Sequence, residues 1–140
     1  RPVTDKDVTL LVADAGQSSV FDMVDALGKR NGQLALRELR RLIDQGENPV
    51  GLLAMIVRQF RLLILVKEMQ GRGAPPDQIA KTLGVHPFVA KKIGEQARAF
   101  RDMEQLELIY RRLLDIDVEI KTGQTPDVLA LDLLVAGLAG

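Results

Sequence analysis

Residues 49–69 read PVGLLAMIVRQFRLLILVKEM, a long stretch rich in leucine, isoleucine and valine. Asn48 precedes the stretch and Pro49 opens it, and proline is favoured in the first turn of a helix. Apolar side chains surround nearly the whole circumference of this predicted helix, so we expect a central helix that several neighbours contact. These side chains are Leu52, Leu53, Met55, Ile56, Phe60, Leu63, Ile64 and Val66.

A membrane span is the alternative for a helix this apolar. However, Arg58, Gln59 and Arg61 lie in the middle of the stretch. A charged residue at the centre of a span costs about 2.5–3.5 kcal/mol on insertion scales. We therefore interpret the stretch as a core helix and expect no association with a membrane.

The rest of the chain also has a helical pattern. Apolar residues recur every three or four positions, and glycine, proline, asparagine and serine separate the periodic segments. The sequence therefore predicts an all-α fold, a compact bundle of about seven or eight helices with one core. Three further helices are expected before the central one: a helix at about 5–13, a helix that begins after Ser18 or Ser19, and a helix that ends at Gly46. Four more are expected after it: at 76–83, at 87–100, from Asp102, and from Thr125 and Pro126.

Composition limits the possible functions. Lysine plus arginine and aspartate plus glutamate number 19 each, so the chain lacks the positive excess typical of a dedicated nucleic-acid binder. Without cysteine there is no disulfide or thiolate metal site, and the single His86 excludes a site that needs two imidazoles. The chain starts without methionine or a signal peptide, so we expect a piece of a longer, cytoplasmic protein.

Motifs that carry chemistry are missing from the sequence. There is no G-x-x-x-x-G-K-[ST] phosphate loop, no dinucleotide-binding G-x-G-x-x-G, no H-E-x-x-H and no G-x-S-x-G. Carboxylates are plentiful, but almost all of them fall on predicted polar faces. We therefore expect no catalytic site, no cofactor and no metal.

Residues 76–93, PDQIAKTLGVHPFVAKKI, have the pattern of a helix-turn-helix motif. Gly84 supplies the turn, and Lys91 and Lys92 lie on the second helix, where a DNA-reading motif makes its contacts. The alternative is an ordinary helical hairpin with solvated lysines. The second helix starts at His86 with His-Pro-Phe in place of base readers such as Arg, Asn or Gln, and we interpret His86 as a capping or surface residue.

Two groups of polar residues are candidates for a site. Arg58, Gln59 and Arg61 interrupt the central helix, either on a solvent-facing side or where a partner protein binds. Asp117 falls in register with the apolar stripe of its helix, four residues before Lys121. This pair is either a surface ion pair or a structural anchor that ties the helix to the following turn at Gly123.

Five short segments of the chain stand out together, at 19–26, 35–39, 59–63, 79–88 and 117–123. In order and spacing they resemble the C-terminal region of the delta subunit of the bacterial DNA polymerase III clamp loader. The opening residues 3–8 resemble the end of the lid domain that precedes this region. The resemblance implies two parts, residues 1–15 from a lid-like helical domain and residues 16–140 as a C-terminal helical collar domain.

The resemblance also implies a function. In that family the C-terminal domains form a collar that joins the delta subunit to the gamma/tau and delta-prime subunits. The complex opens the sliding clamp and places it on primed DNA. The delta subunit is not an ATPase, and it binds the clamp through an N-terminal region. We therefore expect a non-catalytic assembly domain with only indirect contact to DNA. A helix-turn-helix DNA-binding regulator that uses Pro76 to Ile93 is the alternative.

Overall fold

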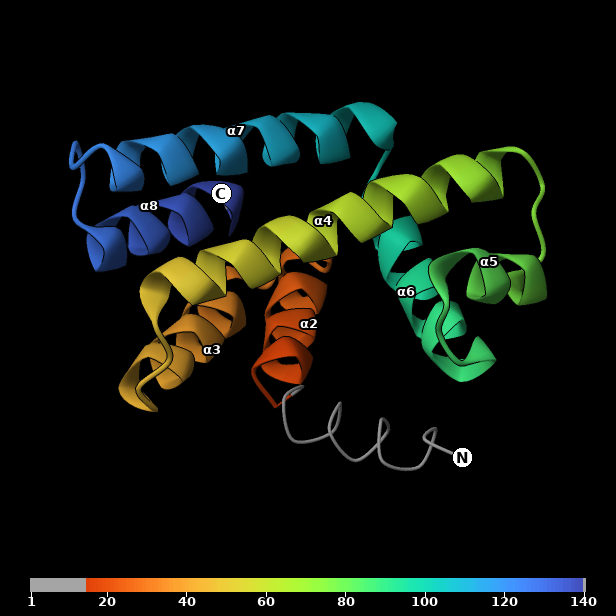
Figure 1. Ribbon diagram of the computed structural model, residues 1–140, viewed down its shortest axis with the longest axis horizontal. Coiled ribbons are helices and arrows are strands. Elements are labelled where there is room, and N and C mark those ends of the chain that lie inside the picture. The colour runs from red at the N-terminus through yellow and green to blue at the C-terminus, as the bar shows by residue number, and fades with distance from the viewer. Residues whose placement is uncertain (1–14, 140) are drawn as a thin grey trace.

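The computed structural model describes residues 15–139, which form seven helices and contain no strand (Figure 1). The all-α prediction is confirmed. The helix expected at about 5–13 lies outside the described residues, and the domain boundary after residue 15 stays a prediction. The helices are α2 (Ala15–Gly28), α3 (Gly32–Asp44), α4 (Pro49–Gly71), α5 (Pro76–Leu83), α6 (Pro87–Ala99), α7 (Met103–Lys121) and α8 (Asp127–Ala139).

Helix α4 is the centre of the fold. It runs across the molecule, with α7 and α8 along one side and α2 and α3 on the other (Figure 1). It packs against α2, α6, α7 and α8, while α5 packs against α6 and α3 against α8. α4 is the one described helix long and apolar enough to cross a membrane. Core helices have the same property, and here four neighbouring helices pack against α4.

One side of α4 is open to solvent. We expected several neighbours to contact this helix, and four helices do, but together they leave this side uncovered. A row of residues along this side is exposed, and its members are three or four positions apart, as on one face of a helix. We call these residues the α4 stripe: Val50, Ala54, Arg58, Arg61, Leu65 and Glu68.

The core forms where α4 meets its neighbours. Phe60 is completely buried, and its ring meets that of Phe100 edge to face, with centroids 5.5 Å apart. Such a contact adds about 0.5–1.5 kcal/mol to the gain from burial. The other large side chains that are fully buried come from five helices: Met23, Leu39, Leu42, Leu52, Leu53, Ile56, Leu63, Leu106, Leu113, Ile116 and Leu131.

Caps fix where several helices begin. The Asn48 Oδ1 atom accepts from the amide of Val50 at 2.8 Å, immediately before α4. The His86 Nδ1 atom accepts from the amide of Phe88 at 3.0 Å, so the interpretation of His86 as a cap is confirmed. Such side chains satisfy amides that have no partner inside the helix.

The start of α2 differs from the expectation. We placed it after Ser18 or Ser19, but the helix already includes Ala15 and Gly16. A single glycine costs a helix only about 1 kcal/mol relative to alanine. Burial of Val20, Met23 and Val24 on the same helix outweighs that cost.

Candidate functional site

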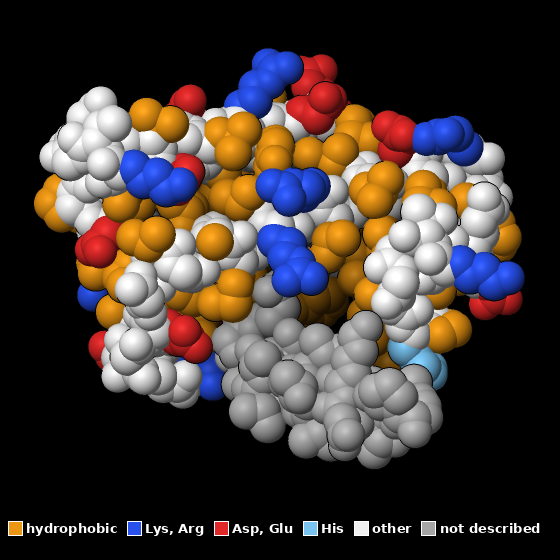
Figure 2. All heavy atoms as spheres, viewed as in Figure 1, with side chains coloured by type: hydrophobic (Ala, Val, Ile, Leu, Met, Phe, Trp, Pro, Cys, Tyr) orange, Lys and Arg blue, Asp and Glu red, His pale blue; other side chains and the backbone are white. Residues whose placement is uncertain are grey.

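The α4 stripe is the first candidate surface. Arg58 and Arg61 are exposed on it, beside Leu65, whose side chain is 38% exposed. Basic and hydrophobic side chains lie next to each other on this face of the molecule (Figure 2). Arginine is enriched in protein interfaces, where its stem packs on apolar surface and its head forms hydrogen bonds.

Helix α7 positions one of these arginines. The Nε atom of Arg61 donates to the hydroxyl of Tyr110 at 3.3 Å. The contact joins the stripe to α7, which packs along α4. Arg61 is thus held beside α7 while the rest of its side chain stays accessible.

Gln59 does not belong to this surface. Its side chain is only 3% exposed, and its Nε2 atom donates to Oε1 of Gln96 at 2.7 Å. Gln96, itself 1% exposed, donates in turn to the backbone carbonyl of Phe21 at 3.0 Å. The prediction of Gln59 as an interface residue is therefore wrong, because its helical position faces α6 and α2. Sequence reasoning missed this network because its members lie far apart in the chain.

A second exposed surface lies on α7 and α8, and the sequence analysis did not single it out. We call it the α7–α8 face. The only hint in the sequence is that α8 is apolar on every side, whereas its neighbours can cover only part of it. Its large hydrophobic residues are 41–57% exposed: Leu108, Leu114 and Val118 on α7, and Leu129 and Leu133 on α8.

Asp117 and Lys121 form the predicted pair. The Lys121 Nζ atom lies 2.9 Å from Asp117 Oδ2, and the side chains are 64% and 30% exposed. Both residues belong to α7, so the pair does not join the helix to the turn. The turn is held by the backbone, where Gly123 adopts φ +75° and the amide of Gln124 donates to the Glu119 carbonyl at 2.9 Å. The geometry favours the surface ion pair over the anchor.

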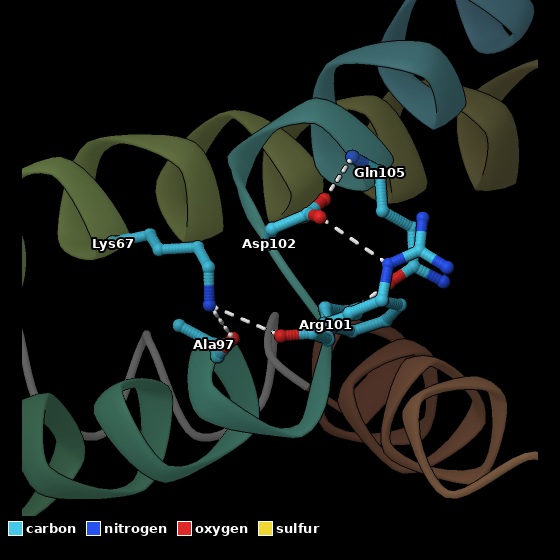
Figure 3. A network of polar contacts seen from close by, with 6 residues as sticks. Lys67, Ala97, Arg101, Asp102 and Gln105 are labelled. Carbon is cyan, nitrogen blue, oxygen red and sulfur yellow. Dashed lines mark hydrogen bonds and ion pairs between the residues drawn. The ribbon is translucent and has the colours of Figure 1, made fainter.

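A polar network joins α4, the end of α6 and the start of α7 (Figure 3). The Lys67 Nζ atom on α4 donates to the carbonyls of Ala97 and Phe100, at 3.0 Å each. A cation is favourable at this position because the last carbonyls of a helix lack partners and carry partial negative charge. The network therefore fixes the end of α6 against the central helix.

Asp102 caps α7 in the same network. One of its oxygens accepts from the amide of Gln105 at 2.9 Å, and the other accepts from Nε of Arg101 at 3.2 Å (Figure 3). The Gln105 amide, and next the Arg101 side chain, hold the pKa of Asp102 below its ordinary value. Gln105 completes the cap differently from a standard capping box, because its Oε1 atom accepts from the amide of Arg101 at 2.7 Å.

The remaining features of the surface are shallow. One hollow of about 370 Å³ lies between the end of α4 and α5, and another of similar volume lies between α2 and α3. Within residues 15–139, no group of three or more His, Cys, Asp or Glu side chains is placed to hold a metal ion. The prominent surfaces are thus the α4 stripe and the α7–α8 face.

Comparisons with known proteins assign the fold. Residues 17–138 match the family model for the DNA polymerase III delta subunit, C-terminal domain. The chain belongs to this family. This delta C-terminal domain is 35% identical over 136 residues to DNA polymerase III subunit delta of Bacillus subtilis (strain 168). The alignment covers 97% of the chain and 39% of the relative.

A solved structure agrees with the assignment. The delta C-terminal domain superimposes on the Bacillus subtilis DNA clamp loader delta protein with a TM-score of 0.84 and 35% identity, over 96% of this chain and 39% of that one. The chain therefore spans about two fifths of the length of these relatives. The resemblance found in the sequence, and the clamp-loader fold that it implied, are confirmed.

Family membership also explains the helix-turn-helix pattern. α5 and α6 form the expected hairpin, with Gly84 in the turn at φ +70° and Ala80 buried where the helices meet. α6 packs on α4 as well as on α5, and its residues Ala90, Ile93 and Ala97 are buried. The apolar spacing therefore serves packing inside the delta C-terminal domain, which makes a separate DNA-binding regulator unnecessary as an explanation.

Proposed function

We propose that this chain is a non-catalytic assembly domain, which joins the delta subunit to the other clamp-loader subunits. The observation that carries the proposal is the α7–α8 face, which holds five of the nine exposed large hydrophobic residues of the described part of the chain, each 41–57% exposed. Apolar surface of this extent typically marks a protein–protein contact. The match to the delta C-terminal domain supports an assembly with other clamp-loader subunits.

The α4 stripe supplies a second surface for the same function. A subunit inside a ring contacts one neighbour on each side, so it needs two different surfaces. The α7–α8 face is mainly apolar, whereas the stripe combines Arg58 and Arg61 with apolar residues. We assign each surface to a different neighbour in a collar.

The partners follow from the family. They are the gamma/tau and delta-prime subunits, bound through their own C-terminal helical domains in the cytoplasm. Contact with the sliding clamp belongs to another part of the delta subunit. In this way the domain supports the loading of the clamp onto primed DNA, with no catalytic step of its own.

Co-elution tests the proposal. The chain is mixed with the C-terminal domains of gamma/tau and delta-prime, and the mass of the eluted species is measured by gel filtration with light scattering. We expect a heteromeric species of defined mass that contains the chain. Elution of the chain at its own mass of 15.4 kDa, at concentrations where the partners associate with each other, would sink the proposal.

A further inference from the structure

The outer side of the α5–α6 hairpin has unpaired positive charge. Residues 76–99 contain four basic side chains, Lys81, Lys91, Lys92 and Arg98, but only two acidic ones, Asp77 and Glu95. All four basic side chains are exposed. Throughout residues 15–139, the ion pairs found involve other lysines and arginines and none of these four. A charged surface of this kind can attract an anionic partner.

An exposed aromatic ring lies beside these charges. Phe88 is 60% exposed, more than any other large hydrophobic side chain of the described residues. The Lys92 Nζ atom lies 5.2 Å from the centre of the ring, within the range of a cation–π contact. Phe88, Lys91 and Lys92 are three and four residues apart on α6, so they share one face of the helix.

The hairpin holds this group rigidly. The Phe88 amide is bonded to His86, and Gln70 on α4 donates to the carbonyl of Gly94 at 3.1 Å. Ile93 and Ala97 on the other side of α6 are buried against the core. A ligand therefore meets a preorganised surface and loses little binding energy to ordering it.

We propose that the Phe88–Lys91–Lys92 face, with Lys81 across the turn, binds single-stranded nucleic acid. An unpaired base stacks on the Phe88 ring, and the lysines contact backbone phosphates on either side of that base. This inference goes beyond assembly, because it assigns a direct DNA-contacting surface to a domain that was expected to touch DNA only indirectly.

The chemistry of the face favours a single strand over other anionic partners. Bases in a duplex are stacked on each other and offer no free face to Phe88, while the start of α6 lacks the side chains that read base edges. An acidic peptide would pair with the lysines but would leave the ring without a matching flat surface. The binding is sequence-independent, and three lysines predict a slope of log affinity against log salt of about −2.

Fluorescence anisotropy of a labelled oligothymidine of about 20 nucleotides tests the proposal with the full 140-residue chain. We expect Phe88→Ala to weaken binding about 5- to 100-fold, which corresponds to the loss of one stacked base. Lys91→Gln with Lys92→Gln should reduce the salt slope by about 1.4. Because all three side chains are exposed, the variants keep the fold, and circular dichroism checks this.

Matched controls separate this site from general charge effects. Arg37→Gln with Arg111→Gln removes the same charge from exposed positions on α3 and α7, and Leu108→Ala removes an exposed apolar side chain elsewhere. These controls should leave binding unchanged. The proposal is overturned if the oligonucleotide does not bind in about 50 mM salt, if the controls weaken binding as much as the hairpin variants, or if polyglutamate competes as well as oligothymidine.

The same variants distinguish this inference from the assembly function. The hairpin substitutions should leave co-elution with the partner domains intact, because they lie outside the α4 stripe and the α7–α8 face. Loss of oligonucleotide binding with intact co-elution supports both proposals. Intact oligonucleotide binding in the hairpin variants overturns only the DNA inference.

Discussion

The glutamine pair inside the domain shows how one residue can be misplaced from sequence. Gln59 lies between Arg58 and Arg61, which made a shared polar surface a reasonable expectation. Its partner Gln96 lies 37 residues away, and only the folded structure brings the two amides together. A buried amide is stable only when it has a partner, so the second glutamine decides the position of the first.

We predict that Gln96→Leu destabilises the domain by about 1–3 kcal/mol, because it leaves the buried amide of Gln59 without its acceptor. Replacing both Gln59 and Gln96 with leucine should recover much of the loss, since no buried amide is then left unpaired. Urea unfolding of the single and double variants measures the coupling. Additive effects of the two substitutions would show that the pair does not interact.

Asp102 predicts a dependence of stability on pH. The Gln105 amide and Arg101 lower its pKa from 3.8, so its carboxylate stabilises the folded state above that pH. The contribution is lost as the pH falls from 3.8 through the lower pKa of the folded state. Asp102→Asn keeps a capping oxygen but does not titrate in this range.

We therefore expect Asp102→Asn to be less stable than the original chain at pH 7, with a difference that shrinks as the solution is acidified below pH 3.8. Unfolding in urea at a series of pH values measures the difference. A gap between the two proteins that stays constant down to the lowest pH would contradict the role assigned to this carboxylate.

Helix boundaries show which features of a helix can be predicted from the sequence. Asn48 and Pro49, and likewise His86 and Pro87, mark helix starts that the structure confirms. These signals are local, because a cap and a proline act on the first turn alone. The start of α2 was misplaced because burial of its apolar face outweighs one glycine. Whether one side of α4 stays open depends on how many neighbouring helices reach it, and no local sequence pattern gives that number.

The turn between α5 and α6 depends on the backbone conformation of a glycine. Gly84 has φ +70°, and nothing lies within 4 Å of where a Cβ atom would be, so only the backbone conformation opposes a side chain. Gly84→Ala should destabilise the domain by about 1 kcal/mol. Gly71→Ala is the matched control, because Gly71 also faces open space but is helical and lacks a positive φ.

Replacing Gly71 should leave stability unchanged or raise it by about 0.5–1 kcal/mol, because alanine favours the helix. Thermal unfolding of the two variants compares them directly. The interpretation fails if both substitutions shift the midpoint in the same direction by the same amount.

At the scale of the whole molecule, the sequence indicates the fold clearly, but it does not show which surfaces are exposed. Helical periodicity predicted the all-α bundle, and five short segments were enough to indicate the family. The interface residues were harder to predict, because exposure depends on the packing of all seven described helices. Helical spacing places Leu131 and Leu134 on the inner side of α8, but only the structure shows that Leu129 and Leu133 on the other side are exposed.

The α7–α8 face is where the assembly function is tested most directly. Leu129→Glu with Leu133→Glu places two charges on this face without touching the core, since both leucines are about half exposed. Arg37→Glu with Lys91→Glu introduces the same number of acidic residues at exposed positions away from both surfaces. Circular dichroism verifies that each variant keeps its helices.

The decisive measurement is the mass, by light scattering after gel filtration, of each variant mixed with the C-terminal domains of gamma/tau and delta-prime. The assembly function predicts that the original chain and the control elute in a heteromeric complex of full mass, while the Leu129→Glu, Leu133→Glu variant loses the neighbour that binds this face and elutes at a lower mass. A complex of unchanged mass and stability with both leucines replaced would contradict it, because the exposed apolar face would then have no part in holding the subunits together.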